Sequence, residues 1–309
     1  MTEAIGPLAF CFPPEPRPGY RWNEAWRSEP VGAECLERTE DFARKRGVSE
    51  TSLAQVELFA ASVAAARLVR QRWGVTPAFA VPHSVGLYAA LVDTGVWSLE
   101  QGLDYTITAG EFIHDFTRNG GFAMAAILGF PEDVLLKICN ETGGGGKVHM
   151  VGHNAPRFST IAGDREATQR VLDRVLAEGA TDARFLPSPA PLHTGLVWEI
   201  RDRLRRYIAD WSLGAPAYPI VHPYHARVVT PDELPGLPAD HMVMQVRWRE
   251  AAGFVLSQGV RLFVETGGVK VLSKFVAWID SDVTTVSITE PTDIRLLSKI
   301  ASRARHEEV

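Results

Sequence analysis

The stretch from residue 78 to residue 91 constrains the chain most, because it combines a strand, a tight turn and a helix around one serine. The apolar run 78–81 predicts a buried strand, and a helix-forming run containing Gly86 follows shortly after it. A serine in such a turn presents its hydroxyl outward, and the backbone N–H of the next residue, Val85, lies where an oxyanion can be held. Ser84 is therefore a candidate nucleophile for acyl transfer. An ordinary turn serine that caps a helix explains these residues equally well.

The composition excludes several classes of protein. With 309 residues, 46% of them hydrophobic and 22% charged, the chain is long enough to form two globular units. The formal net charge of -5 argues against a nucleic-acid partner. Cys11, Cys35 and Cys139 lack disulfide or metal-ligand spacing, which favours a reducing compartment. The chain shows no signal-peptide pattern and no run of about 18 apolar residues. We therefore expect a cytoplasmic protein without a membrane partner.

The order of the expected elements indicates an α/β fold with two units. Strand-like runs at 8–12 and 78–81 alternate with helical patterns, the clearest at 51–73, and predict an α/β-hydrolase-like core with a parallel sheet. Residues 13–32, rich in proline and arginine, are expected to form a loop. Between 122 and 186 the order becomes strand, helix, strand, strand, helix, strand, which is the order of a ferredoxin-like unit. We assign residues 1–117 and 188–309 to the α/β-hydrolase-like large subdomain and residues 118–187 to an inserted ferredoxin-like small subdomain.

Six short segments resemble the motifs of a known family. Pro82–Leu91 (PHSVGLYAAL) stands where the family has G-H-S-x-G-E-Y-x-A-L. Pro189–His193 (PAPLH) resembles the segment that ends in the catalytic histidine, and Glu265–Leu272 (ETGGVKVL) resembles its E-x-G-P-G-K-V-L turn. The matches run in the family's order from about Phe10 to Glu290. On these motifs, the chain resembles the malonyl-CoA:acyl-carrier-protein transacylase family, which includes the acyltransferase domains of polyketide synthases.

The resemblance implies a role for each matched site residue. Ser84 would attack an acyl thioester, and His193 would take the serine proton and return it to the leaving thiol. The backbone N–H groups of Val85 and Glu15 would form the oxyanion hole, although Glu15 stands where the family has a glutamine. His241 occupies the position of the residue that orients the histidine. No bound cofactor is implied, because the acyl group travels on the phosphopantetheine arm of an acyl carrier protein or of CoA.

One departure from the family pattern bears on the substrate. Members that use malonyl groups hold the free carboxylate with an arginine, and ungapped register from Ser84 puts Ala109 at that position. Arg118 lies ~13 Å further along a helix, too far to replace it. Burying a carboxylate without a partner costs several kcal/mol. We therefore expect a neutral or amino-bearing acyl group, in a pocket formed by Ala109, Leu192 and His83.

Three activities share these residues. Transfer of the acyl group to a carrier-protein thiol makes the protein an acyltransferase, and transfer to water makes it a thioester hydrolase. A catalytically impaired relative that acts as a docking subunit is the third possibility. We favour transfer of a starter or aminoacyl group between carrier proteins in polyketide biosynthesis.

Three further groups of residues carry weaker signals. Arg205 and Arg206, on an expected helix, are candidate docking residues for an acidic carrier protein, although a solvated helix face explains them as well. His222 and His225 lack neighbouring cysteines or carboxylates at ligand spacing, so we expect no metal site. The glycine-rich stretch 143–147 lacks the serine or threonine of a phosphate-binding loop and is expected to be a flexible hairpin or linker.

Overall fold

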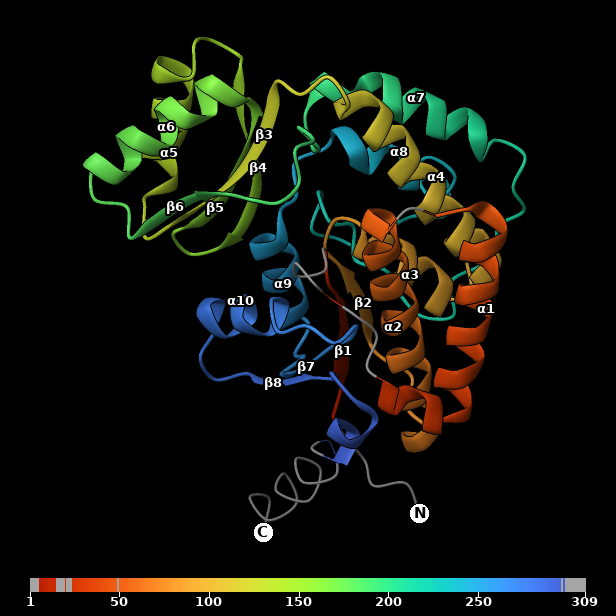
Figure 1. Cartoon of the computed structure of the whole chain (residues 1–309). Coiled ribbons are helices and arrows are strands. Elements are labelled where there is room, and N and C mark those ends of the chain that lie inside the picture. Colours follow the sequence, from red (N-terminus) through yellow and green to blue (C-terminus); the bar gives the residue numbers. More distant parts are fainter. Residues whose placement is uncertain (1–5, 15–19, 21–23, 49, 296, 298–309) are drawn as a thin grey trace.

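The chain folds into a large unit and a small unit that lie side by side (Figure 1). The computed structural model describes residues 6–14, 20, 24–48, 50–295 and 297. Among the helices of this described part, none has the length and apolar character needed to cross a membrane.

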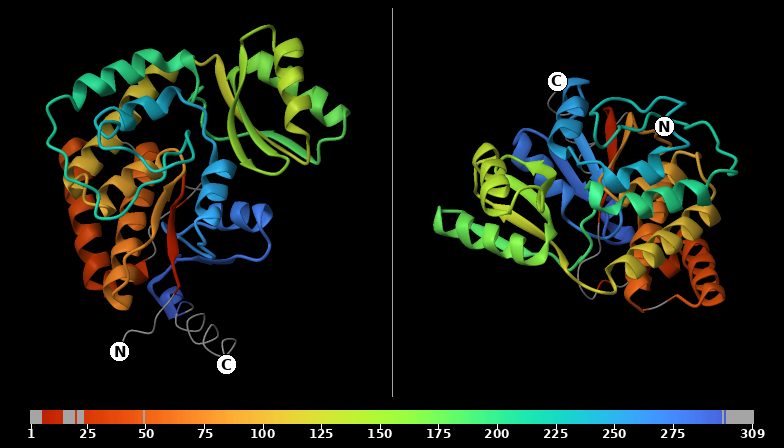
Figure 2. Two further views of the ribbon diagram at one scale, coloured as in Figure 1. Left: turned by 180° about the vertical axis from the view of Figure 1, so that it is seen from behind. Right: turned by 90° about the horizontal axis from the view of Figure 1, so that it is seen from above.

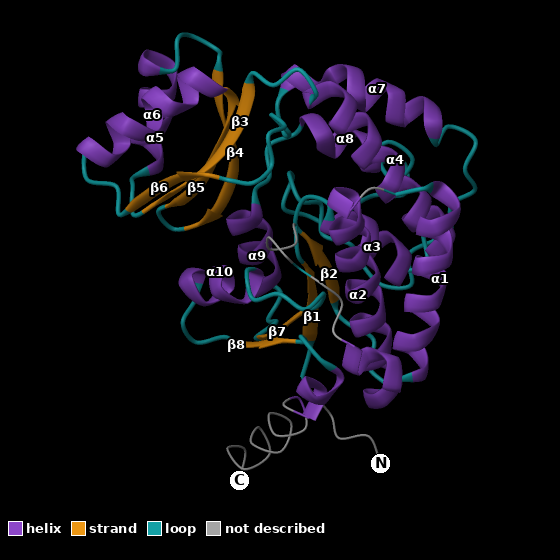
Figure 3. Ribbon diagram, viewed as in Figure 1, coloured by secondary structure: helices purple, strands orange, loops and turns teal. Residues whose placement is uncertain are grey.

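A four-stranded parallel sheet of order β2-β1-β7-β8 forms the centre of the large unit (Figure 3). Its strands are β1 (Leu8–Phe12), β2 (Phe79–Pro82), β7 (Leu262–Glu265) and β8 (Thr284–Ser287). Every residue of β1 is buried, as expected when both faces of a parallel sheet are covered. The predicted parallel α/β core is confirmed.

Helices cover both faces of this sheet, with α1 to α4 on one side and α9 and α10 on the other (Figure 1). Their bounds are α1 (Pro30–Arg46), α2 (Glu50–Trp73), α3 (Gly86–Asp93), α4 (Leu99–Thr117), α9 (Trp248–Ser257) and α10 (Leu272–Ile279). Helix α7 (Trp198–Tyr207) packs against α4 and against the short helix α8 (Leu237–Asp240). The segment 13–32, predicted as a loop, contains a 3-10 helix at Glu24–Ser28 and the first turn of α1. Proline at the first position of α1 explains its start, because proline presets the helical φ angle and needs no N–H partner there.

The small unit is an antiparallel sheet of order β4-β5-β3-β6. Its elements are β3 (Phe122–Leu128), α5 (Glu132–Thr142), β4 (Val148–Ala155), β5 (Phe158–Asp164), α6 (Arg165–Ala177) and β6 (Asp182–Phe185). This is the ferredoxin-like arrangement that the sequence predicts, and it falls within residues 118–187.

The two faces of strand β3 serve different purposes. Because successive side chains of a strand point to opposite faces, Ala125 and Ile127 pack under α5 and α6, on the side away from the large unit (Figure 2). Met124 and Ala126 line the cleft between the units. Val246 of the large unit is hydrogen-bonded to β4 of the small unit. The Val246 N–H donates to the Val151 carbonyl, and the Val246 carbonyl accepts from the His153 N–H, both at 2.9 Å. The β3 face of the small unit is thereby held toward the carboxyl ends of β1 and β2.

Candidate active site

Ser84 lies in the turn between β2 and α3, with a φ angle of 51°. A left-handed backbone is uncommon for a residue other than glycine and stores strain at this turn. Gly86 allows the turn to form, because a Cβ atom there would lie 2.1 Å from the carbonyl oxygen of Phe12. The turn is fixed from the other side by the His83 N–H, which donates to the same carbonyl at 3.0 Å. The serine hydroxyl is thus presented at the end of the sheet, as in a nucleophile elbow.

His193 comes from a distant loop and faces this serine. Its Nε2 atom lies 2.8 Å from Ser84 Oγ. The backbone of His193 is also left-handed, with a φ angle of 64°, and it is held by a 2.6 Å bond from its N–H to the Met242 carbonyl. Nδ1 lies 2.9 Å from the carbonyl oxygen of His241 and 3.1 Å from that of Met244.

These two carbonyls determine the tautomer of His193. A carbonyl oxygen can only accept a hydrogen bond, so Nδ1 carries the ring proton. Nε2 is then an unprotonated acceptor that faces the serine hydroxyl. Burial, which the two hydrogen bonds only partly offset, lowers the pKa of His193 to about 4. The ring is therefore neutral at pH 7 and can accept the serine proton, with two carbonyl dipoles to stabilise the imidazolium that forms.

One of the two predicted oxyanion-hole donors, Val85, lies among the described residues. In the portion of the chain that the structure covers, the Val85 N–H at the start of α3 has no hydrogen-bond acceptor. It is free to donate to a developing oxyanion beside Ser84. Glu15, the second predicted donor, lies outside the described residues.

His241 contacts His193 through its backbone and not through its ring. The His241 ring is fully buried, and its Nε2 lies 2.6 Å from the hydroxyl of Tyr88. Tyr224 donates its hydroxyl to the same His241 carbonyl at 3.1 Å. The side-chain role expected for position 241 therefore needs correction, since the ring turns away and the backbone provides the acceptor. The second acceptor, Met244, has no signal in the sequence, because a backbone carbonyl leaves no trace in residue type.

His83 joins the two units at the wall of the site. Its Nε2 lies 2.9 Å from the Oδ1 atom of Asn154 on β4. Burial lowers the pKa of His83 to about 4. A neutral His83 that donates to Asn154 therefore fixes the small unit beside the serine.

A cleft of about 600 Å³ opens at Ser84 and His193. His83 and Leu192, two of the residues predicted for the acyl pocket, line this cleft. Most of its remaining wall is apolar and comes from both units: Met124, Ala126, Leu128, Val151, Phe158, Phe185, Leu186, Val246, Val271, Phe275 and Trp278.

The cleft also has cationic side chains. Arg184 forms an ion pair with Asp182, whereas Lys270 and Lys274 are exposed and have no ion-pair partner among the described residues. Glu265 holds the element that carries Lys274, because its buried carboxylate accepts the N–H groups at the start of α10, each at 2.9 Å. The Glu265–Leu272 motif therefore positions side chains that line the cleft.

Ala109 does not share this cleft, which corrects its predicted place in the acyl pocket. It lines a separate cavity of about 20 Å³ together with Val85 and Gly86. Helix α4 packs against the far side of α3, where the rings of Tyr88 and Tyr105 lie 4.8 Å apart, and so it places position 109 behind the turn. Among the described residues that line this cavity, none is basic.

The two predicted docking residues lie away from the cleft. Arg205 is paired with Asp240, with Nε to Oδ1 at 3.0 Å and Nη2 to Oδ2 at 2.5 Å, and it lines a different cavity behind His193. Arg206 is exposed on α7 and forms no ion pair in the described part of the chain. Neither residue is among those that line the cleft at Ser84.

A strained serine at the end of a parallel sheet, paired with a neutral histidine, is an arrangement that acyl-transfer enzymes and hydrolases with a serine nucleophile share. Comparison with known proteins identifies the family. Residues 23–267 match the acyl transferase domain family. The malonyl CoA-acyl carrier protein transacylase of Escherichia coli (strain K12) is 31% identical over 246 residues, which cover 79% of this chain and 80% of that protein.

Two further similarities extend this comparison. A crystal structure of the acyl-carrier-protein S-malonyltransferase of Burkholderia pseudomallei aligns with a TM-score of 0.87 and 26% identity, over 95% of this chain and all of that one. A polyketide biosynthesis protein of Burkholderia thailandensis is 27% identical over 243 residues, which are 79% of this chain and 20% of that longer protein. The protein belongs to the acyl transferase domain family and is an acyltransferase.

Proposed function

We propose that this acyltransferase moves an acyl group between phosphopantetheine thioesters through an ester on Ser84. The proposal rests on the 2.8 Å contact between Ser84 Oγ and His193 Nε2, with the His193 Nδ1 proton held by two carbonyls. No carboxylate contacts Nδ1 in the described part of the chain. The histidine therefore acts as the base without an acidic partner.

The first half-reaction loads the serine. Ser84 Oγ attacks the thioester carbonyl carbon while its proton moves to His193 Nε2. The carbonyl oxygen becomes an oxyanion that the Val85 N–H stabilises, with the N–H of residue 15 as the second proposed donor. When the C–S bond breaks, His193 gives its proton to the departing sulfur, and a thiol and an acyl-Ser84 ester remain.

The second half-reaction runs these steps in reverse with a new thiol. His193 takes the proton of the incoming thiol, and the sulfur attacks the ester carbonyl carbon. The C–O bond to Ser84 breaks, and Nε2 returns its proton to Oγ. The enzyme is regenerated and the acyl group has changed carriers.

Acyl carrier proteins are the proposed partners. The relatives from Escherichia coli and Burkholderia pseudomallei are named for action on acyl carrier proteins. The exposed lysines Lys270 and Lys274 on the cleft suit an acidic partner and the phosphate of its phosphopantetheine arm. Arg206, exposed on α7, is a second docking candidate, whereas the charge of Arg205 is already balanced by Asp240.

The transferred group is proposed to be neutral or amino-bearing and not malonyl. Alanine stands at the position of the family's carboxylate-binding arginine, and the walls of the cleft beside Ser84 are mainly apolar. A free carboxylate placed against these walls would lose its hydration without gaining a fixed partner.

Intact-protein mass spectrometry tests both statements. The protein is incubated with an equimolar mixture of malonyl, acetyl and longer neutral acyl thioesters, and a Ser84→Ala variant serves as the control. We expect neutral acyl adducts on the wild type and none on the variant. A malonyl adduct of similar yield contradicts the proposed specificity but leaves the serine mechanism standing, whereas equal adducts on the variant contradict the mechanism.

Adding a carrier-protein thiol to the loaded enzyme separates transfer from the alternatives. Transfer gives the acyl carrier protein, hydrolysis gives the free acid at a rate that the thiol does not change, and a docking subunit forms no adduct. We expect transfer.

The setting is proposed to be polyketide biosynthesis in the cytoplasm. The match to the Burkholderia thailandensis polyketide protein supports the first statement. The second is supported by Cys11, Cys35 and Cys139, which are buried and free of disulfides, as is usual in a reducing compartment.

A further inference from the structure

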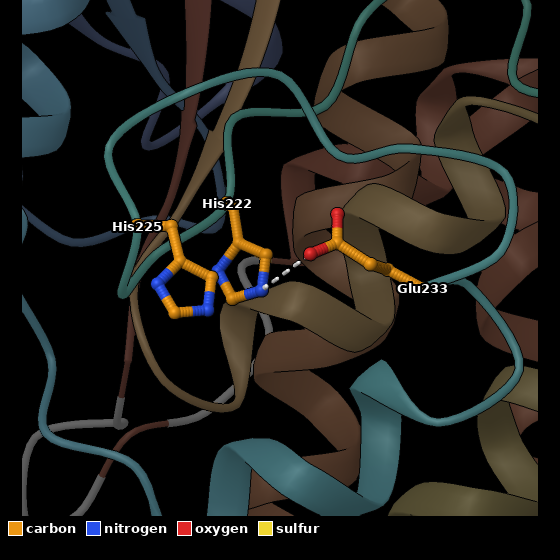
Figure 4. A group of neighbouring side chains, drawn as sticks. All are labelled: His222, His225 and Glu233. Atoms are coloured by element: carbon orange, nitrogen blue, oxygen red, sulfur yellow. Dashed lines mark ion pairs between the residues drawn. The ribbon is translucent and has the colours of Figure 1, made fainter.

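A group of three potential metal ligands lies behind the catalytic histidine. His222, His225 and Glu233 each place one ligand atom within 4.8 Å of the other two (Figure 4). Nε2 of His222 lies 4.0 Å from Oε1 of Glu233, and the two imidazole rings have centroids 4.3 Å apart. The spacing of these residues in the sequence does not predict a metal site. The chain between His225 and Glu233 folds back and brings the carboxylate to the histidines.

From this geometry we propose that His222, His225 and Glu233 bind a zinc ion. Two imidazoles and one carboxylate are a common zinc ligand set, and imidazole nitrogens favour zinc over magnesium or calcium. Zinc-ligand distances of about 2.0–2.2 Å require the ligand atoms to approach one another by roughly 1 Å. His225 is exposed and can make this movement by rotating its side chain. The cavity of about 540 Å³ that contains all three residues leaves room for water as a fourth ligand.

The present contacts of Glu233 are compatible with metal binding. Arg227 donates to both carboxylate oxygens, at 2.9 Å to Oε2 and 2.5 Å to Oε1. The N–H and hydroxyl of Thr230 donate to Oε2 at 2.9 and 3.0 Å. Among the residues that the structure describes, Oε1 therefore accepts one hydrogen bond and keeps a lone pair on the side of His222. The other contacts hold the carboxylate in place, as partners outside the metal ligands do in known sites.

His222 has to change one contact when it binds the ion. The Tyr224 N–H donates to its Nδ1 at 3.2 Å, so the neutral ring carries its proton on Nε2. Coordination through Nε2 moves this proton to Nδ1 and releases the long bond from Tyr224. Zinc binding therefore breaks one neutral hydrogen bond in exchange for a metal-nitrogen bond.

The proposed site lies against the groups that hold His193. Tyr224, between the two histidines in sequence, donates its hydroxyl to the His241 carbonyl, which is one of the two acceptors of His193 Nδ1. Met244, which provides the other acceptor, lines the same cavity as the three ligands. Zinc would therefore cross-link the loop that orients the catalytic base, on the side away from the substrate cleft.

Zinc titration of the full-length, chelator-treated protein tests the site. We expect isothermal titration calorimetry to show one zinc ion bound per chain and the unfolding temperature to rise when zinc is added. His225→Ala removes an exposed ligand without breaking the Arg227–Glu233 pair, and it should weaken zinc binding about tenfold or more. His114→Ala, an exposed histidine on α4, is the matched control and should bind zinc like the wild type. Magnesium should not bind at this site.

Two results would overturn the assignment. The first is the absence of zinc binding by the wild type. The second is equal zinc affinity of the wild type and His225→Ala, since the ion would then be bound elsewhere. Both variants are compared without metal by thermal unfolding, so a loss of fold is seen separately from a loss of zinc. None of these measurements depends on acyl transfer, so the result stands apart from the proposed function.

Discussion

The cavity that contains Ser84 and the cavity that contains Ala109 lie on opposite sides of the same turn, and they differ sharply in size. The first measures about 600 Å³, is lined by both units and reaches exposed lysines. The second measures about 20 Å³, room for about one water molecule. Ala109, which the sequence motifs predict to stand at the position of the family's arginine, therefore faces only a small cavity.

The comparison shows how the proposed specificity would work. Neighbouring residues fill the space around position 109, so the acyl group has to lie in the cleft at Ser84. In the proposed specificity, the mainly apolar walls beside Ser84 would then disfavour a carboxylate-bearing substrate.

Removing the base should nearly abolish reaction in the cleft. His193→Ala leaves the Ser84 hydroxyl without a proton acceptor, and we expect serine acylation to slow by about 10⁴-fold or more. Single-turnover acylation followed by mass spectrometry measures the effect, with His114→Ala as the control. A loss of less than about tenfold would mean that another group acts as the base.

Acid should lower the free energy of unfolding through two histidines that line the cleft. His83 and His193 have folded pKa values of about 4, below the value of about 6.5 for an unfolded histidine. Above pH 6.5 both states are neutral; as the pH falls toward 4, the unfolded chain binds protons that the folded chain does not. At pH 5 each histidine should reduce the free energy of unfolding by about 2 kcal/mol relative to pH 7.

Urea unfolding at pH 7 and pH 5 measures this loss. His83→Gln should lower the pH dependence by about one proton. Equal pH dependence in His83→Gln and the wild type would show that His83 is not held neutral.

The wall between the two cavities should depend on Gly86. In Gly86→Ala the new methyl group would lie 2.1 Å from the Phe12 carbonyl oxygen, so α3 has to shift. We expect a loss of about 3 kcal/mol in the free energy of unfolding, with slower acylation because Ser84 moves with the turn. Gly253→Ala is the control, since its Cβ would meet nothing within 4 Å on helix α9. That variant should gain about 0.5–1 kcal/mol, and similar losses in both variants would contradict the close approach at Gly86.

The sequence predicts the parts of the molecule that depend on local pattern. The strand-turn-helix at Ser84, the helix that ends at Trp73 and the ferredoxin-like order of the small unit follow from periodicity and turn residues. Helix α1 was missed, because its apolar positions are separated by many charged residues and its start lies in a segment rich in proline and arginine.

The parts of the site that escaped prediction depend on tertiary folding. The acceptors for His193 are backbone carbonyls, which any residue type can supply. Ungapped register predicts the position of Ala109 in the family pattern, but only the packing of α4 on α3 determines which cavity this residue lines. Glu233 reaches His222 only because the intervening loop folds back.

Reversing a charge at the cleft should have the smallest effect, a change in KM for the carrier protein. Comparing two such variants shows which face of the enzyme binds the carrier protein. Lys274→Glu reverses a charge on the cleft at Ser84, whereas Arg206→Glu reverses an exposed charge on α7, away from the cleft. Because exposed ion pairs contribute less than about 1 kcal/mol, we expect Lys274→Glu to raise KM for an acyl carrier protein about two- to fivefold at low salt. The effect should fade as salt screens the interaction, and KM for a small acyl thioester should not change. A larger rise in Arg206→Glu would place the carrier protein on α7, as the sequence suggested, and would separate the docking face from the cleft.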